Sequence, residues 1–391
     1  MNPDQQAVFD TVIKDKSNVL ITGGAGVGKS YLIKQIVQHC ESKKIIHGVT
    51  ATTGSAAFLI DGMTVHSFFG IKLKLGKTID KNIKRLYRNN KKHYDKLTKL
   101  KLLIIDEISM MNHELFEYLN EYLQVIKKND HLFGGVQIVL CGDMHQLPPC
   151  DGLTFQESPI WLEHDWITCE LTKSIRQEND NDFAQMLNRI RIGIFNKDDI
   201  KALRKPRKLK NATVLFSTNK KVDDYNNLKI NNILQKGAKS RIYKATRSNE
   251  QVLLCSGLKV MLTTNIDVSQ GLCNGAIGKV IDIFETEVSV EFTNKKKVII
   301  PYVDVYNDDD IVINSIMPLR AAYAITINKC QGMTLGAVVL SMEDFDAFKD
   351  VRGRFYTAIS RVRALDDLVI VGDVKARHVM QKIEFKNKSS I

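Results

Sequence analysis

The sequence has no long apolar segment. None of its 391 residues lies in a window that approaches the roughly 18 apolar residues of a membrane-spanning helix. The first six residues, MNPDQQ, also lack the basic and then apolar layout of a secretory signal peptide. These absences argue against a membrane or secreted protein. We therefore expect a soluble intracellular protein, and the sequence does not distinguish nucleus, cytoplasm or a viral replication site.

Metal-binding and disulfide-forming cysteine patterns are missing as well. The seven cysteines are odd in number and form no CxxC pair and no Cys/His cluster. This pattern argues against a disulfide framework and against a structural zinc site. We expect most of the cysteines to be buried and reduced. The chain also contains no internal repeat, coiled coil or low-complexity tract.

The composition is that of a folded globular protein, with 44% hydrophobic and 26% charged residues. A chain of 391 residues exceeds what one hydrophobic core usually holds, which favours two lobes. The net charge of +12 favours a polyanionic partner, because neutralising phosphates releases counterions. From charge alone, a nucleic-acid partner and a merely solvated lysine-rich surface are equally good explanations.

Short apolar runs alternate with amphipathic stretches in the first half of the chain. The predicted strands cover residues 19–21, 45–46, 102–105 and 136–140, and the predicted helices cover 29–40, 53–60 and 113–126. Runs this short and this rich in β-branched residues are typical of parallel strands that helices cover on both faces. The pattern predicts an α/β lobe.

The second half repeats this pattern, with predicted strands at 214–216, 338–340 and 368–371. We expect an N-terminal lobe over residues 1–174 and a C-terminal lobe over 175–391. Two stretches depart from the alternation. Residues 71–100 are polar and basic and predict a small helical insertion, whereas residues 271–316 contain alternating strands and predict a small β insertion.

A glycine-rich turn carries the strongest chemical signal. Residues 23–30, GGAGVGKS, fit the pattern GxxxxGK[ST], follow an apolar strand and open an amphipathic helix. Backbone amides of such a turn cradle phosphate oxygens, its lysine reaches the β- and γ-phosphates, and its hydroxyl binds Mg²⁺. We therefore predict a nucleoside triphosphate site formed by Gly23, Gly24, Ala25, Gly26, Val27, Gly28, Lys29 and Ser30.

Polar residues follow two further predicted strands. Asp106 and Glu107 end the apolar run 102–105, where a carboxylate beside a phosphate-binding turn would hold Mg²⁺ and a second would polarise the attacking water. The alternative is a solvated acidic turn. Gln146 follows the run 136–140, and on the residues alone it is equally a γ-phosphate sensor or a loop residue. Asp143 is equally a turn-former.

The ordered set of motifs resembles superfamily 1B helicases, most closely the petite integration frequency (PIF) family, relatives of RecD and Dda. The resemblance rests on residues 23–30, 50–57 (TATTGSAA), 64–70 (TVHSFFG), 106–110 (DEISM), 142–149 (GDMHQLPP), 324–334 (AITINKCQGMT) and 356–363 (YTAISRVR). It implies two RecA-like lobes, with the β insertion forming a small barrel and residues 71–100 resembling a wedge that helps to split duplexes.

Several residue roles are implied by this resemblance. Gln5 would bond the adenine, and Gln146 would contact the γ-phosphate. Arg176 and Arg361, from the second lobe, would act as arginine fingers on ATP held between the lobes; on spacing alone, surface ion pairs remain the better explanation for both. The resemblance places a single-strand contact at Thr52, Thr53, His66, Phe68, Asn265, Thr326, Lys329 and Gln331. Phe68 is equally well explained as a core residue.

We therefore interpret the chain as an ATP- and Mg²⁺-dependent DNA helicase. The resemblance implies 5′ to 3′ movement on single-stranded DNA, tailed or forked duplexes as substrates, a monomer, and work in replication, repair or recombination. Asn328, Cys330 and His145 depart from the family pattern, and we expect an altered grip on DNA there. An RNA-directed superfamily 1 helicase, a non-unwinding nucleic-acid-stimulated ATPase and a P-loop kinase remain alternatives.

Overall fold

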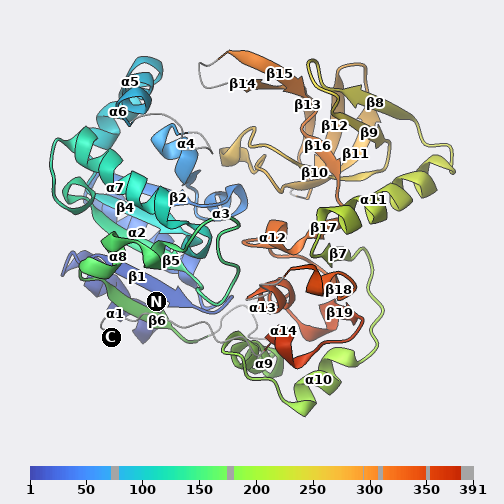
Figure 1. Cartoon of the computed structure of the whole chain (residues 1–391), viewed down its shortest axis with the longest axis horizontal. Coiled ribbons are helices and arrows are strands. Elements are labelled where there is room, and N and C mark those ends of the chain that lie inside the picture. Colours follow the sequence, from blue (N-terminus) through green and yellow to red (C-terminus); the bar gives the residue numbers. More distant parts are fainter. Residues whose placement is uncertain (72–78, 174–179, 294, 307–310, 349–352, 380–391) are drawn as a thin grey trace. The chain divides into compact units, whose positions relative to one another are not determined.

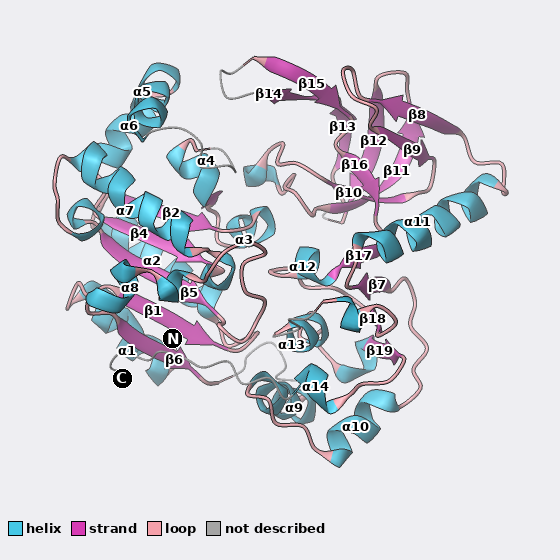
Figure 2. Cartoon of the chain, in the orientation of Figure 1, coloured by secondary structure: helices cyan, strands magenta, loops and turns pink. Residues whose placement is uncertain are grey.

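Two structural units make up the described part of the chain. The computed structural model describes residues 1–71, 79–173, 180–293, 295–306, 311–348 and 353–379 (Figure 1). The first unit draws its residues from Met1–Lys201, Val351–Leu365 and Lys375–Ile391, and the second from Ala202–Asp350 and Asp366–Val374. The helical and strand segments of both units are distinguished in Figure 2.

A six-stranded parallel sheet forms the centre of the first unit, in the order β3-β2-β4-β5-β1-β6. Every residue of β1 and β4 is buried, as expected for strands with helices on both faces. The bounds are β1 Val19–Gly23, β2 His47–Ala51, β3 Met63–Thr64, β4 Leu102–Asp106, β5 Gln137–Gly142 and β6 Ile167–Leu171.

The second strand was predicted two residues too early, at 45–46. Lys44 takes a left-handed backbone with φ 55°, and the amide of Ile45 bonds the carbonyl of Cys40, so this segment ends the preceding helix and leaves the sheet to begin at His47. Apolar character alone does not separate a helix end from a strand start.

Helices surround this sheet, and several begin at side chains that cap them. The N-caps Thr53, Thr64 and Asn112 each accept a hydrogen bond from a backbone amide three residues later. The helices of the first unit are α1 Pro3–Ile13, α2 Lys29–Ser42, α3 Gly54–Leu59, α4 Val65–Phe69, α5 Ile79–Asn89, α6 Lys91–Thr98, α7 His113–Lys127, α8 Pro159–Glu163, α9 Asn181–Arg191, α13 Arg354–Ile359 and α14 Ala376–Val379, and α10 Lys197–Arg204 crosses into the second unit.

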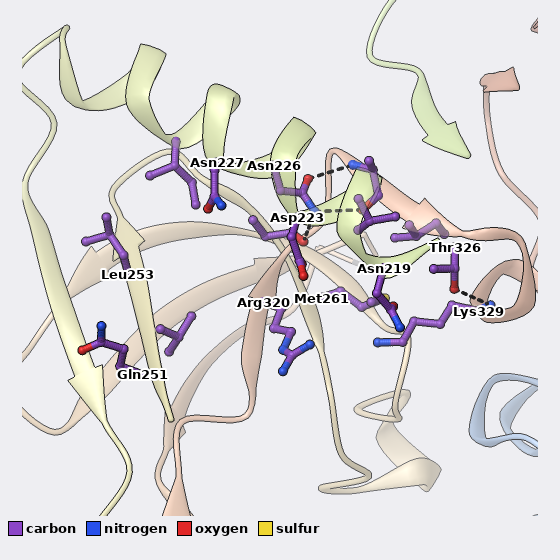
Figure 3. Close-up of a pocket in the computed structure, with 16 residues that line it drawn as sticks. Asn219, Asp223, Asn226, Asn227, Gln251, Leu253, Met261, Arg320, Thr326 and Lys329 are labelled. Carbon is purple, nitrogen blue, oxygen red and sulfur yellow. Dashed lines mark hydrogen bonds between the residues drawn. The ribbon is translucent and has the colours of Figure 1, made fainter. Parts of the chain in front are cut away.

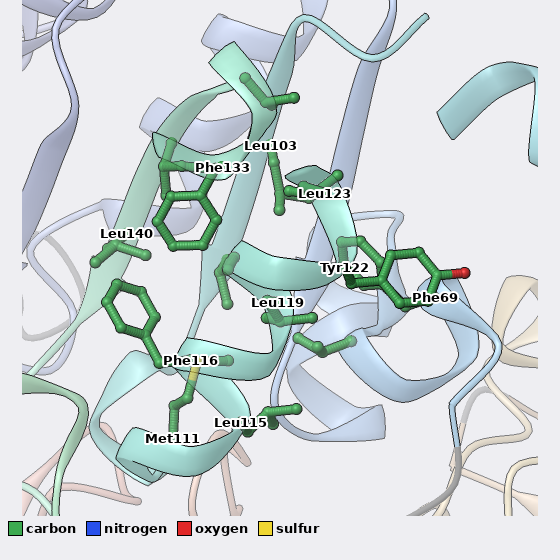
Figure 4. Packing of buried hydrophobic residues seen from close by; sticks show 14 of the residues in the cluster. Phe69, Leu103, Met111, Leu115, Phe116, Leu119, Tyr122, Leu123, Phe133 and Leu140 are labelled. Carbon is green, nitrogen blue, oxygen red and sulfur yellow. The ribbon is translucent and has the colours of Figure 1, made fainter. Parts of the chain in front are cut away.

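Helix α7 supplies much of the core of the first unit (Figure 4). Its buried residues recur at helical spacing and include Phe116, Leu119 and Leu123, which pack with Leu103 of β4 and Leu140 of β5. Aromatic rings extend this core through Phe133, Phe155, Trp161 and Trp166.

The insertion at residues 71–100 is helical, as predicted, and consists of α5 and α6 over its described part. Leu86 and Leu97 point into the core of the first unit, and the Asn82 amide donates to the Tyr118 hydroxyl of α7 at 2.5 Å. The helices present their basic residues outward, because only the apolar stripe finds core to pack against.

A four-stranded parallel sheet of order β17-β7-β18-β19 organises the second unit. The predicted strands at 214–216, 338–340 and 368–371 are confirmed within one residue. The bounds are β7 Thr213–Phe216, β17 Ala324–Thr326, β18 Val338–Ser341 and β19 Leu368–Val371, with helices α11 Asn219–Leu234 and α12 Ile327–Cys330.

The predicted β insertion is an antiparallel five-stranded sheet of order β13-β12-β11-β10-β16. It reaches beyond the predicted bounds 271–316, because β10 and β16 lie outside them. Two hairpins, β8-β9 and β14-β15, accompany the sheet. The bounds are β8 Ser240–Lys244, β9 Gln251–Cys255, β10 Lys259–Leu262, β11 Ile277–Ile283, β12 Glu287–Phe292, β13 Lys297–Pro301, β14 Val303–Tyr306, β15 Val312–Ile316 and β16 Leu319–Ala321.

The division into units differs from the two predicted lobes. Three described segments that the sequence analysis gives to the second lobe have their contacts in the first unit: residues 180–201, 353–365 and 375–379. Six of the seven cysteines are buried, as predicted, and Cys150 is exposed. Within the described ranges, no helix combines the length and hydropathy needed to span a bilayer.

Candidate active site

The glycine-rich turn joins β1 to α2 in the first unit. Gly28 is the N-cap of α2 at φ 90°, a left-handed conformation that favours glycine, and it offers no capping side chain. The first amides of α2 are therefore left for an external acceptor. At Gly23 a Cβ atom would lie 2.4 Å from the carbonyl oxygen of Leu171, so only glycine fits there. The turn has the form of an anion cradle.

Lys29 begins α2 and folds back over the turn. Its Nζ donates to the carbonyl oxygens of Gly23 at 2.7 Å and Gly24 at 2.9 Å. Ser30 follows it in the first helical turn and is half-buried. An ammonium and a hydroxyl thus flank the free helix amides, which is the donor set that a polyphosphate and its Mg²⁺ require.

Asp106 and Glu107 lie at the carboxyl end of β4. Asp106 is 6% exposed, and its Oδ1 accepts the backbone N–H of Glu107 at 2.9 Å. Burial and the neighbouring Glu107 charge raise the pKa of Asp106 to about 7. A cation beside a buried carboxyl favours its ionised form, so the Asp106 carboxyl and the Ser30 hydroxyl are donors that fit Mg²⁺. Lys29 lies close enough to lower this pKa in part.

The backbone at Glu107 is held in an unusual conformation. Its φ of 54° and ψ of 41° place a non-glycine residue in the left-handed region. Thr52, which follows β2, bonds this segment twice: its amide donates to Asp106 O at 3.2 Å and its hydroxyl donates to Glu107 O at 2.9 Å. Thr52 therefore positions the carboxylate that is predicted to act on water.

Asp143, after β5, is the centre of a fully buried polar network. It accepts hydrogen bonds from the Arg191 guanidinium at 3.0 Å and the Tyr356 hydroxyl at 2.9 Å. Burial alone would raise the pKa of Asp143, but Arg191 and His145 hold it well below its usual range. The Tyr356 hydroxyl also accepts the N–H of Ala25 at 2.9 Å, which connects the network to the phosphate-binding turn.

The predicted γ-phosphate residues are only partly described. Arg361, on the segment after α13, donates from Nη2 to Gln146 Oε1 at 3.3 Å and to Ser360 Oγ at 2.8 Å. Both Gln146 and Arg361 are buried. Arg176 lies outside the described residues.

Gln5 occupies the third helical position of α1. A capping box with Asn2 fixes it, because Asn2 N donates to Gln5 Oε1 at 3.1 Å and Gln5 N donates to Asn2 Oδ1 at 2.8 Å. Its Nε2 is buried and has no acceptor among the residues that the structure describes. Such an orphan amide donor matches the ring-nitrogen acceptor of an adenine.

Comparison with known proteins identifies the family. A family model described as "PIF1-like helicase" matches residues 1–201, and one described as "DNA helicase Pif1, 2B domain" matches residues 239–283. The chain belongs to the PIF1-like helicase family. It is 34% identical over 404 residues to the ATP-dependent DNA helicase PIF1 of Xenopus laevis, and the match covers 95% of this chain but only 61% of that protein.

Two solved structures of this family are similar over nearly the whole chain. The Pif1 helicase of Candida albicans is 30% identical with a TM-score of 0.80, and the match covers 97% of this chain and 96% of that one. The Bacteroides Pif1 helicase in complex with ADP-AlF₃ and single-stranded DNA is 25% identical with a TM-score of 0.80, covering 97% of this chain and 94% of that one. These matches confirm the predicted RecA-like parallel sheets.

The predicted single-strand residues of the first unit lie around β2. Thr53 caps α3, and His66, in α4, is half-buried, with burial lowering the pKa of its imidazole. Phe68 is 2% exposed and packs edge-on against Phe69 and His93. The Phe68 ring is thus part of the core, which favours the alternative of a core residue, and stacking of Phe68 on a base stays a prediction.

The predicted single-strand residues of the second unit are distributed over two loops and α12. Thr326 caps α12 by accepting the amide of Lys329, whose side chain is exposed. Gln331 is buried, and Asn265 accepts the amide of Asn274 at 2.8 Å, which fixes the loop before β11.

The three departures from the PIF pattern have different surroundings. Cys330 is buried and its thiol donates to Ile327 O at 3.0 Å, which is a hydrogen bond within α12. His145 lies 3.6 Å from Asp143 Oδ1 and lowers the pKa of that carboxyl. Asn328 is half-buried.

Sequence reasoning missed the roles of Tyr356, Asp143 and Arg191. Tyr356 belongs to the same motif as Arg361, residues 356–363, and its place in that motif was the signal that could have indicated its role. Arg191 carries no sequence signal, because a single arginine at a helix end is usually a surface residue.

Proposed function

We propose that the chain is an ATP-dependent DNA helicase that moves 5′ to 3′ along single-stranded DNA and unwinds tailed or forked duplexes. One observation carries the proposal, in a chain of the PIF1-like helicase family: the phosphate-binding turn follows β1, and the buried Asp106 and half-buried Glu107 lie at the carboxyl end of β4. The turn can bind a triphosphate, and a carboxylate beside it can support hydrolysis.

Each residue then has a chemical task. Lys29 and the amides of the turn would neutralise the β- and γ-phosphates, while Ser30 and Asp106 would hold Mg²⁺, which supplies charge neutralisation on the phosphate oxygens. Glu107 would orient and deprotonate the attacking water. Three further residues complete the proposal: Gln5 for the adenine, and Gln146 and Arg361 for the γ-phosphate. Arg176 keeps its proposed role from the family pattern alone.

The nucleic-acid contacts are proposed from the same pattern. Thr52, Thr53 and His66 of the first unit and Asn265, Thr326, Lys329 and Gln331 of the second offer hydroxyls, amides and an ammonium, which suit phosphate contact without base reading. The lobe boundary at residues 174 and 175 and the wedge role of residues 71–100 belong to this proposal as well.

Unwinding of tailed duplexes tests the function. We expect a 5′-tailed DNA duplex to be separated with ATP and Mg²⁺, a 3′-tailed duplex to stay intact, and no separation without ATP. The opposite tail preference would overturn the direction. Separation of RNA but not DNA would favour an RNA-directed helicase, and DNA-stimulated hydrolysis without separation would favour a non-unwinding ATPase.

A further inference from the structure

A hollow in the second unit lies outside the nucleotide site described above. Its volume is about 340 Å³, and α11 faces strands β9, β10, β16 and β17 across it (Figure 3). This volume is near the lower end of the roughly 300–1,000 Å³ typical of small-ligand sites, so it suits one nucleotide rather than a large cofactor.

The back wall of the hollow is fixed by Asn226. Its Nδ2 donates to Ala321 O and Ala324 O, both at 3.0 Å, and its Oδ1 accepts the amide of Ala324 at 2.9 Å. Asn226 is 5% exposed. Both N–H bonds of this amide are used within the unit, so Asn226 ties α11 to β16 and β17. The wall is therefore built before any ligand arrives.

Two cations share the rim of the hollow. Arg320 projects from β16, and Lys329 projects from α12 next to Asn219 (Figure 3). Partial burial and then the charge of Arg320 lower the pKa of Lys329, which Asp223 offsets in part. Within the described ranges, neither Arg320 nor Lys329 has a carboxylate within 4.0 Å. Asp223 is the one carboxylate among the described lining residues, so two cations outnumber it at the rim and favour a phosphate between them.

The lining combines exposed amides with apolar side chains. The side chains of Asn219, Asn227 and Gln251 form no hydrogen bond with any described residue, and Leu253 and Met261 belong to the same lining (Figure 3). Amides that both donate and accept can meet the edge of any base, so they select no sequence. None of the described residues that line the hollow is aromatic. Without a ring to stack on, a free nucleotide would bind weakly, whereas a nucleotide held by its neighbours in a strand would not.

We propose that this hollow takes one nucleotide of single-stranded DNA, with its phosphate between Arg320 and Lys329 and its base turned into the space beside Asn227, Gln251 and Leu253. The proposal rests on the proposed function and extends it, because it adds Arg320 and a base pocket to the predicted contacts. It implies that the strand is held by a turned-out base in the second unit as well as by its phosphates.

Two exposed positions test the two halves of the site. Arg320→Ala removes the phosphate partner, and Asn227→Met fills the base space with a flexible apolar side chain. The controls are Lys236→Ala, two residues after the end of α11, and Asn232→Met on α11, and neither residue lines the hollow. The probes are an oligothymidine strand and an all-abasic strand of equal length, whose dissociation constants are measured by fluorescence anisotropy, with thermal unfolding as a check of folding.

We expect Arg320→Ala to weaken binding of both strands about fivefold more than Lys236→Ala does, because one charge-assisted contact to phosphate is lost. Asn227→Met should weaken the thymidine strand about threefold and leave the abasic strand unchanged, since only a base enters the filled space. Equal effects of Arg320→Ala and its control would overturn the phosphate site. Equal effects of Asn227→Met on both strands, or none, would overturn the base pocket.

The two proposals fail separately. If the wild-type chain neither hydrolyses ATP in the presence of DNA nor separates the 5′-tailed duplex, the proposed function falls. If it does both and the four variants bind alike, only the pocket falls.

Discussion

Glu107 has a strained backbone at the point where catalysis is proposed. A left-handed conformation costs a non-glycine residue about 1–3 kcal/mol, and it persists only where the surroundings enforce it. Here the Thr52 hydroxyl, bonded to Glu107 O, and the Asp106 carboxylate, bonded to Glu107 N, enforce it from both sides. Thr52 is also a proposed strand contact. A strand that shifts Thr52 would therefore shift Glu107, which gives nucleic acid a short route to the hydrolytic residue.

Thr52→Val should weaken this route and Thr52→Ser should preserve it. Valine keeps the shape but removes the hydroxyl, and the loss of one hydrogen bond of about 0.5–1.5 kcal/mol predicts a roughly two- to tenfold lower kcat of DNA-stimulated hydrolysis. The KM for ATP should stay the same, because Thr52 is not among the residues proposed to bind the nucleotide. A kcat of Thr52→Val equal to that of Thr52→Ser would contradict the positioning role.

Lys29→Ala should remove ATP hydrolysis and with it DNA unwinding. Loss of the cation that neutralises the transferring phosphate predicts a fall of at least about 100-fold in kcat. Lys34→Ala is the matched control: Lys34 lies on the same helix and pairs with Asp61 at the surface at 2.8 Å. Steady-state phosphate release measures both. Undiminished hydrolysis by Lys29→Ala would refute the assignment of Lys29.

The residues whose types carry a chemical signature could be predicted from the sequence. The glycine-rich turn, Asp106 and Glu107 lie where the motifs indicate. The role of Phe68 could not be predicted in this way, because a core ring and a base-stacking ring look the same in sequence and only burial distinguishes them. Tyr356 and Arg191 escaped prediction because their partner, Asp143, is more than 45 residues away from each along the chain.

At the scale of elements, the helical insertion is stabilised from within the main core. Leu97 of α6 is completely buried, and the Lys127 ammonium of α7 donates to Thr98 O at 3.0 Å and Leu100 O at 2.8 Å. The insertion is therefore anchored on α7 by apolar packing and by backbone acceptors at its end.

Leu97→Ala should destabilise the first unit. Removing a completely buried leucine side chain predicts a loss of about 2–5 kcal/mol in the free energy of unfolding. Leu153→Ala, at a side chain that is 54% exposed, should change that free energy by less than about 0.5 kcal/mol. Urea unfolding followed by tryptophan fluorescence measures both, since Trp161 and Trp166 belong to this core. Equal stability of the two variants would contradict the anchoring role of Leu97.

Strands with an apolar run or a regular alternation were predictable, and short strands without either pattern were not. The run at 102–105 predicts β4 because both faces of that strand are buried. In contrast, β6 includes Thr168 and an exposed Glu170 at an edge of the sheet, and β17 has only three residues. Such elements are defined by the strands beside them, which lie far away in sequence.

At the scale of the whole molecule, the charge of +12 predicts binding of DNA that depends strongly on salt. Each phosphate neutralised on a single strand contributes about −0.7 to the slope of log K against log salt concentration. We expect a slope of about −2 or steeper for an oligothymidine strand, equivalent to three or more phosphates. Arg320→Ala should make the slope shallower by about 0.7. A slope near zero would exclude phosphate contact as the source of affinity.

The hydroxyl of Tyr356 already takes up one backbone amide of the phosphate-binding turn. It accepts the single proton of the Ala25 amide and gives its own proton to Asp143. A phosphate oxygen that binds the Ala25 amide would have to displace this hydroxyl. One acceptor then replaces another, so the exchange adds little hydrogen-bond free energy to nucleotide binding. The displaced tyrosine keeps Asp143 as its remaining partner, so filling the turn at Ala25 would leave Tyr356 bonded to the carboxylate that also holds Arg191.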